Sequence, residues 1–190
     1  MSKKIGILGG TFNPPHIGHL IIANEVLNAL RLDEVRFMPN ATPPHKQEDE
    51  QVTAAQRLKM VQLAIRGIPN LSVETIELER GGTSYTIDTV EMLKQREPES
   101  EFYFIIGGDQ VEYLPNWHRI DELVQKVQFV GVPRPNTKIE SAYPISTIAI
   151  PQIDISSTLV RNRLMNGVTT KLLIPDKVID FIQKEKLYEI

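Results

Sequence analysis

The chain has 190 residues, with 21 Lys and Arg against 24 Asp and Glu, so its formal net charge is −3. This acidic balance argues against broad nucleic-acid binding, which needs a basic face. It contains no cysteine, which excludes disulfides and thiolate metal sites. No apolar run approaches the roughly 18 residues of a membrane span, and the N-terminus lacks the apolar region of a signal peptide, so we expect a cytoplasmic protein that binds neither nucleic acid nor membrane.

Short apolar runs alternate along the chain with segments of helical apolar spacing. The runs predict buried strands, and the spaced segments predict amphipathic helices. In chain order we predict a strand at 5–8, a helix at 18–32, a strand at 35–38, a helix at 53–65, a strand at 71–78, a helix at 84–96, a strand at 102–106, helices at 111–113 and 120–127, strands at 129–132 and 147–150, and helices at 157–165 and 175–186. This alternation indicates an α/β fold, a doubly wound parallel sheet with helices on both faces and a C-terminal helical segment. At this length, we expect residues 1–190 to form one domain.

Polar turns follow three of the predicted strands, after Leu8, Ile106 and Ile150. Ligands of such a sheet bind beyond the carboxyl ends of its strands, where the strand order reverses. We therefore expect the three turns to converge on one crevice. A long polar loop at 39–52 is typical of a functional segment, and we expect its residues 43–46 to close over a bound ligand.

The first turn carries the string GGTFNPPHIGH. Gly9 and Gly10 lack side chains where the strand ends, so a ligand can approach the backbone there. Gly18 lies at the start of a helix whose free N–H groups and positive dipole end suit phosphate. His16 and His19 can share one face of the first helical turn and donate hydrogen bonds to phosphoryl oxygens. They could also bind zinc, but the sequence marks no third ligand.

A second string, ISSTLVR, begins at Ile155. Ser156, Ser157 and Thr158 would cap a helix and present hydroxyl and N–H groups at its N-terminus. Arg161, one turn later, could clamp phosphate oxygens in a bidentate manner. Alone, the string favours a plain serine-rich cap with a solvated arginine.

Together, the two strings resemble the nucleotidyltransferases with an HxGH sequence, which implies a Rossmann-like fold that activates ATP at its α-phosphate. The strings PNATPPHK, GGTSYTIDT and FIIGGDQ and the stretch 113–117 resemble, over nearly the whole chain, the bacterial nicotinate-nucleotide adenylyltransferases. One departure is Asn13, where many members carry Asp, and it removes a charge beside the phosphates. The resemblance implies adenylyl transfer from ATP to nicotinate mononucleotide in NAD biosynthesis, Mg²⁺ carried mainly by the ATP phosphates, and a homodimer.

The resemblance also implies three overlapping groups of site residues. The residues expected to stabilise charge are His16, His19, Lys46, Ser157 and Arg161. The residues expected to bind ATP are Gly9, Gly10, Thr11, Phe12, His16, His19, Gly107, Asp109, Ile155, Ser156, Ser157 and Arg161. The residues expected to bind the nicotinate nucleotide are Lys46, Ser84, Tyr85, Thr86, Tyr113, Trp117 and Arg134. No residue is expected to be a direct metal ligand.

The chemistry of a pyridine mononucleotide fits several of these residues, and each also has a plainer interpretation. Trp117, the single tryptophan, can stack on the ring or simply pack a loop. The helix start at 82–86 can hold a carboxylate or be an ordinary cap, and a neutral amide would gain less from its dipole. Lys46 and Arg134 can bind phosphate or remain solvated. Asp109 suits a ribose hydroxyl, a metal-bound water or a helix N-cap.

Three alternatives stay open at this point. Phosphopantetheine and nicotinamide mononucleotide adenylyltransferases share the HxGH string and differ in the acceptor. An aminoacyl-tRNA synthetase uses a similar string, but this chain is short, acidic and without a KMSKS-like lysine loop. A non-catalytic nucleotide sensor would bind ATP without turnover.

Overall fold

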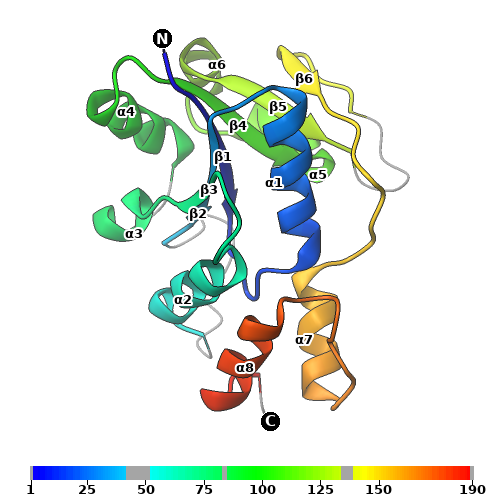
Figure 1. Cartoon of the computed structure of the whole chain (residues 1–190). Coiled ribbons are helices and arrows are strands. Elements are labelled where there is room, and N and C mark those ends of the chain that lie inside the picture. Colours follow the sequence, from blue (N-terminus) through cyan, green and yellow to red (C-terminus); the bar gives the residue numbers. More distant parts are fainter. Residues whose placement is uncertain (1, 42–51, 83–84, 134–138, 189–190) are drawn as a thin grey trace.

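The computed structural model describes residues 2–41, 52–82, 85–133 and 139–188. Its centre is a sheet of six parallel strands in the order β3-β2-β1-β4-β5-β6 (Figure 1). The strands are β1 (Lys4–Gly10), β2 (Glu34–Pro39), β3 (Leu71–Val73), β4 (Glu101–Gly107), β5 (Gln128–Val132) and β6 (Ile145–Thr147). The chain fills one half of the sheet outward from β1 and then the other half outward from β4. The predicted doubly wound, Rossmann-like sheet is therefore confirmed, with its switch point between β1 and β4.

Helices cover both faces of this sheet. They are α1 (Ile17–Ala29), α2 (Ala54–Ala64), α3 (Ile76–Arg80), α4 (Thr86–Arg96), α5 (Gly108–Tyr113), the 3₁₀ helix η1 (Leu114–Asn116), α6 (Ile120–Lys126), α7 (Ser157–Met165) and α8 (Asp176–Lys184). Side chains of α1 and α2 join the core on one face of the sheet, and those of α4, α5 and α6 join the core on the other.

The apolar run of β4 shows why the sheet must be covered on both sides. Phe102, Phe104 and Ile106 pack into the core under α4 and α6, whereas Tyr103 and Ile105 pack into the core under α1. Successive residues of a strand point to opposite faces, so an uninterrupted apolar run fits only a strand buried on both faces.

The C-terminal helices form a third, smaller core of their own. Val160 of α7 and Val178 and Ile182 of α8 pack there with Met60 and Ala64 of α2. Figure 1 shows α7 and α8 close together at the end of the molecule where α2 also lies. This packing places the C-terminal segment beside the carboxyl ends of the central strands.

Several predicted boundaries were wrong. The helix predicted at 18–32 ends at Ala29, and the helix predicted at 111–113 begins at Gly108. The strand predicted at 71–78 ends at Val73, because the Glu74 carboxylate accepts a 3.1 Å hydrogen bond from the Ile76 N–H and the chain turns into α3. The last strand lies at Ile145–Thr147 rather than 147–150, since it pairs only as far as Gly131 of β5. The last helix ends at Lys184 rather than 186, and Pro175 is its N-cap instead of its first helical residue.

Candidate functional site

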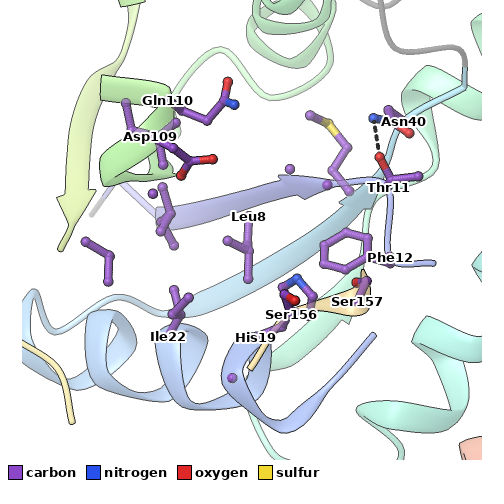
Figure 2. A pocket seen from close by; sticks show the side chains of 18 of the residues that line it. Leu8, Thr11, Phe12, His19, Ile22, Asn40, Asp109, Gln110, Ser156 and Ser157 are labelled. Atoms are coloured by element: carbon purple, nitrogen blue, oxygen red, sulfur yellow. Dashed lines mark hydrogen bonds between the residues drawn. The ribbon is translucent and has the colours of Figure 1, made fainter. Parts of the chain in front are cut away.

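One cleft of about 1660 Å³ lies along the carboxyl ends of β1 and β4 (Figure 2). The turns after β1 and β4 and the segment after Ile150 all line it, so their predicted convergence is confirmed. Pockets for one drug-sized ligand have volumes of about 300–1,000 Å³. This cleft is therefore large enough for two nucleotides side by side.

Every predicted site residue within the described ranges lines this cleft. They are Gly9, Gly10, Thr11, Phe12, His16, His19, Tyr85, Thr86, Gly107, Asp109, Tyr113, Trp117, Ile155, Ser156, Ser157 and Arg161. Lys46, Ser84 and Arg134, together with the loop at 43–46, lie outside the described residues.

The two histidines of the first string form one stacked unit at the start of α1. His16 is the N-cap residue, and its backbone N–H donates to Nδ1 of His19 at 3.1 Å. The imidazole rings stack with centroids 3.7 Å apart, and the ring of Phe12 meets that of His19 edge-on at 5.0 Å. Because Nδ1 of His19 accepts a hydrogen bond, the proton of the neutral ring is on Nε2. His19 is therefore a fixed hydrogen-bond donor.

Gly18 is the residue that lets His16 lie against the start of the helix. A Cβ atom at position 18 would lie 3.0 Å from Nδ1 and 3.1 Å from Cε1 of His16. A larger residue would thus push the imidazole away from its stack with His19. The glycine of the HxGH string is required by side-chain packing here, and its backbone φ is not in the left-handed region.

The second string is bound directly to the first. Ser156 caps α7 by accepting from the Leu159 N–H at 3.1 Å. The Ser157 hydroxyl donates to the Pro14 carbonyl at 2.9 Å, across 143 residues of sequence. Figure 2 shows Ser156 and Ser157 close to His19 and Phe12. The serine-rich segment is therefore both a helix cap and a wall of the cleft.

Arg161 completes the link between the strings. Its Nη1 donates to the Asn13 carbonyl at 2.8 Å, and its Nη2 donates to Oγ1 of Thr158 at 3.3 Å. The plainer interpretation, a solvated arginine, is wrong at this position. A guanidinium carries five N–H groups, so Arg161 retains donors for a ligand.

Aromatic residues line the part of the cleft near α4 and η1. The ring of Trp117 meets those of Phe104 and Phe129 edge-on at 6.1 and 6.0 Å. Trp117 therefore packs against the core, as the plainer interpretation has it, and also lines the cleft, so its stacking on a ligand ring stays a prediction. Tyr85 is 41% exposed and contacts the ring of His118 at 4.8 Å. Tyr85 is also the N-cap residue of α4, which begins at Thr86 rather than at the predicted residue 84.

Asp109 lies in the first turn of α5, and the N-cap of that helix is Gly107. The N-cap interpretation of Asp109 is therefore wrong. Figure 2 shows its side chain at the rim of the cleft, next to Gln110 and across from Leu8 and Ile22. A carboxylate at this place can accept hydrogen bonds from hydroxyl groups of a ligand.

Sequence reasoning missed Arg57, a buried cation in the cleft wall. Only 6% of this residue is exposed, and its guanidinium donates to the carbonyls of Thr11 at 2.9 Å, Asn40 at 2.8 Å and Ala41 at 3.1 Å. It thereby joins the ends of β1 and β2. The sequence could have indicated a buried position by spacing, because Arg57 lies on the same face of α2 as the buried Met60.

The described residues hold no group of three or more His, Asp or Glu side chains placed to bind a metal ion. No helix within the described ranges is long and apolar enough to cross a membrane.

Comparisons with known proteins agree with this geometry. Residues 7–163 match the cytidylyltransferase-like family. The chain is 55% identical over 185 residues to a probable nicotinate-nucleotide adenylyltransferase of Geobacillus thermodenitrificans, covering 97% of this chain and 86% of that protein. It is 49% identical over 187 residues to the nicotinate-nucleotide adenylyltransferase of Bacillus subtilis, covering 98% and 99%.

A solved structure has the same fold. Plasmodium falciparum nicotinic acid mononucleotide adenylyltransferase, complexed with NaAD, superimposes with a TM-score of 0.83 at 23% identity, covering 98% of this chain and 97% of that one. The same protein complexed with APC gives a TM-score of 0.79 at 24% identity, covering 98% and 97%.

Proposed function

The chain belongs to the nicotinate-nucleotide adenylyltransferases of the cytidylyltransferase-like family, and we propose that the cleft described above carries out their reaction. The reaction transfers the adenylyl group of ATP to nicotinate mononucleotide, releases pyrophosphate and yields nicotinate adenine dinucleotide for NAD biosynthesis. The assignment to this cleft is carried by the hydrogen bonds between the two sequence strings. Ser157 and Arg161 of the second string donate to the loop that leads to His16 and His19 of the first.

The reaction forms one phosphorus–oxygen bond and breaks another. An oxygen of the acceptor 5′-phosphate attacks the α-phosphorus of ATP, and pyrophosphate leaves with the electrons of the broken bond. The acceptor phosphate is already an anion, so no residue has to remove a proton. The protein must hold two polyanions in line and stabilise the charge that develops between them.

Each proposed group has a distinct part in that stabilisation. Nε2–H of His19 donates to an oxygen of the triphosphate, and its direction is fixed by the bond from His16 to Nδ1. Arg161 supplies positive charge with the N–H groups that the loop leaves available. The Ser157 hydroxyl has one proton, and it donates this proton in a hydrogen bond to the Pro14 carbonyl. We therefore assign phosphate binding to the backbone N–H of Ser157 at the start of α7. Lys46 is proposed to add charge from the loop.

Mg²⁺ fits this site as a companion of ATP. This cation prefers oxygen ligands and keeps several of its waters, so triphosphate oxygens and water can supply most of its coordination. When bound, it neutralises charge on the phosphates. Asp109 is a carboxylate in the cleft wall and is placed to hold a metal-bound water or a ribose hydroxyl.

The acceptor is proposed to lie between Trp117 and the start of α4. Thr86 and its neighbours present N–H groups at the N-terminus of α4, where the helix dipole favours a carboxylate. The acid form of the pyridine nucleotide gains from that dipole, and the amide form gains less. Tyr113, Ser84 and Arg134 complete the proposed acceptor group.

Substituting Trp117 by Ala tests the acceptor site. Loss of ring stacking is expected to cost about 1–3 kcal/mol, which raises KM for nicotinate mononucleotide about 5- to 150-fold and leaves KM for ATP nearly unchanged. Trp117→Phe, which keeps an aromatic ring, is the matched control and should retain most of the affinity. An unchanged KM for the acceptor in Trp117→Ala would place the pyridine ring elsewhere.

The same residue gives a direct binding assay. Trp117 is the single tryptophan, so fluorescence excited at a wavelength that tyrosine does not absorb reports on this part of the cleft. Titration with nicotinate mononucleotide should change the emission in a saturable manner. Turnover without any change in emission would contradict the proposed site.

We also propose that the protein works in the cytoplasm, because of its composition. We propose that it is a homodimer, because of its family. Sedimentation of the purified chain measures the oligomeric state, and a monomer at micromolar concentration would contradict the dimer.

A further inference from the structure

The loop between β1 and α1 is held by the C-terminal segment through its backbone. Leu173 accepts a 2.9 Å hydrogen bond from the N–H of Ile17, in the first turn of α1. Arg161 donates to the carbonyl of Asn13 at 2.8 Å. These bonds come from two different parts of the segment that follows β6, so the segment as a whole sets the position of the loop.

A further bond reaches the side chain of the same loop residue. The hydroxyl of Tyr188 donates to Oδ1 of Asn13 from 175 residues further along the chain. Tyr188 is 4% exposed and Asn13 is 6% exposed, so the bond lies away from bulk water. Both groups are neutral, and their pairing therefore buries no charge.

The ring of Tyr188 is packed in the C-terminal core. It belongs to the third core, where it packs with Val160 of α7 and with Val178 and Ile182 of α8. The hydroxyl is thus presented to Asn13 by a packed helical unit. His16, which precedes α1, lies three positions after Asn13, and Phe12, on the other side of Asn13, contacts the ring of His19.

We infer that Tyr188 is a positioning residue for adenylyl transfer, acting through Asn13 on the loop that leads to His16 and to His19 in the first turn of α1. The inference rests on the proposed function of the cleft. Without the hydroxyl, Oδ1 of Asn13 loses this donor where water does not readily replace it, so the loop shifts to find another. A shift of about 1 Å in the groups that hold a reacting phosphate is enough to slow the reaction.

Tyr188→Phe removes the hydroxyl and keeps the packed ring. We expect kcat to fall about tenfold, with KM for ATP and for nicotinate mononucleotide changed less than about threefold, because the displaced donors act mainly in the transition state. Tyr103→Phe is the matched control. Tyr103 is 8% exposed, and its hydroxyl donates to Glu101 at 3.2 Å, at the start of β4 and far from the carboxyl ends of the strands. It should keep the wild-type kcat.

A second variant tests the route through Asn13. Asn13→Leu removes the acceptor from the other side of the same bond and should lower kcat at least as much. Adding Tyr188→Phe to Asn13→Leu should then lower kcat by less than about twofold further. Losses that multiply would show that Tyr188 acts independently of Asn13 and would overturn the inference. Asn13→Leu also provides the test if Tyr188→Phe does not fold.

A readout without turnover separates this inference from the proposed function. The chain has four histidines, so the NMR signals of each imidazole can be assigned by substitution. In Tyr188→Phe the signals of His16 and His19 should move, and that of His118 should not. Unchanged His16 and His19 signals would overturn the inference, even in an active enzyme. A wild-type protein that does not release pyrophosphate would overturn the proposed function, and the His signals would still decide whether Tyr188 positions the loop.

Discussion

Substituting His19 by Ala should lower kcat about 10²- to 10³-fold, or about 2.7–4 kcal/mol of barrier, the usual effect of removing one preorganised donor. The physical reason is the fixed Nε2–H of His19, which the bond from His16 and the edge contact with Phe12 direct into the cleft. Steady-state pyrophosphate release measures kcat. Circular dichroism and thermal unfolding of the variant establish that it is folded.

Two further substitutions separate the donor of His19 from its capping role. Asn at position 19 keeps an acceptor close to that of Nδ1, so the bond to the His16 N–H is retained and the distal donor is lost. Gln keeps a distal N–H donor and loses that acceptor. We expect His19→Gln to retain more activity than His19→Asn. The reverse order would show that position 19 matters for the cap of α1 and not for the phosphates, as would near-native turnover of a folded His19→Ala.

Substituting Arg36 by Met should destabilise the protein by about 3 kcal/mol, the lower end of the cost of breaking a buried ion pair. Three carboxylates lose their shared cation, although Lys3 still contacts Glu34 and Arg96 still contacts Glu74. The side chain of Arg36, in β2, is 12% exposed, and its guanidinium contacts Glu34 at 2.7 Å, Glu97 at 2.5 Å and Glu74 at 3.1 Å. The Glu74 side chain is itself only 5% exposed. Urea unfolding measures the loss.

The matched control for this prediction is an exposed arginine with two carboxylate partners. Arg119 contacts Glu122 at 2.6 Å and Glu91 at 3.2 Å, and its side chain is 37% exposed. Since exposed ion pairs contribute little to stability, Arg119→Met should destabilise far less than Arg36→Met. Equal losses for the two variants would contradict a special role for the buried cluster.

The same cluster gives stability a defined dependence on pH. Burial raises the pKa of Glu34, but hydrogen bonds from Lys3 and Arg36 outweigh it and hold this pKa below the ordinary value of 4.5. The hydrogen bond from Arg36 likewise lowers the pKa of Glu97. A folded pKa below the unfolded one stabilises the protein above pH 4.5 and ceases to do so as pH falls through the folded value. The free energy of unfolding should thus fall more steeply in the wild type than in Arg36→Met as pH drops below 4.5, and parallel curves for the two proteins would contradict this dependence.

Local sequence patterns predicted most of the sheet and most of the cleft. The strings that begin at Gly9 and Ile155 each mark a strand end and a helix start, and such sites are built from neighbouring residues. Position along the chain was therefore enough to place His16, His19 and Ser157 in one crevice once the strand order was inferred.

The features that the sequence did not predict depend on contacts between distant segments. Arg57 has the spacing of a core residue, and only the carbonyls of Thr11 and Asn40 explain a cation there. Tyr188 contacts Asn13 across nearly the whole chain. The turn after Val73 depends on the Glu74 side chain, which an alternating apolar pattern does not register.

Pyrophosphate release from ATP and Mg²⁺, with nicotinate mononucleotide or nicotinamide mononucleotide as acceptor, tests the central claim most directly. The cleft predicts release with the nicotinate form and less with the nicotinamide form, because the N-terminus of α4 favours a carboxylate. Binding of ATP without release from either acceptor would contradict the claim. It would leave a nucleotide-binding cleft whose acceptor is not a pyridine nucleotide.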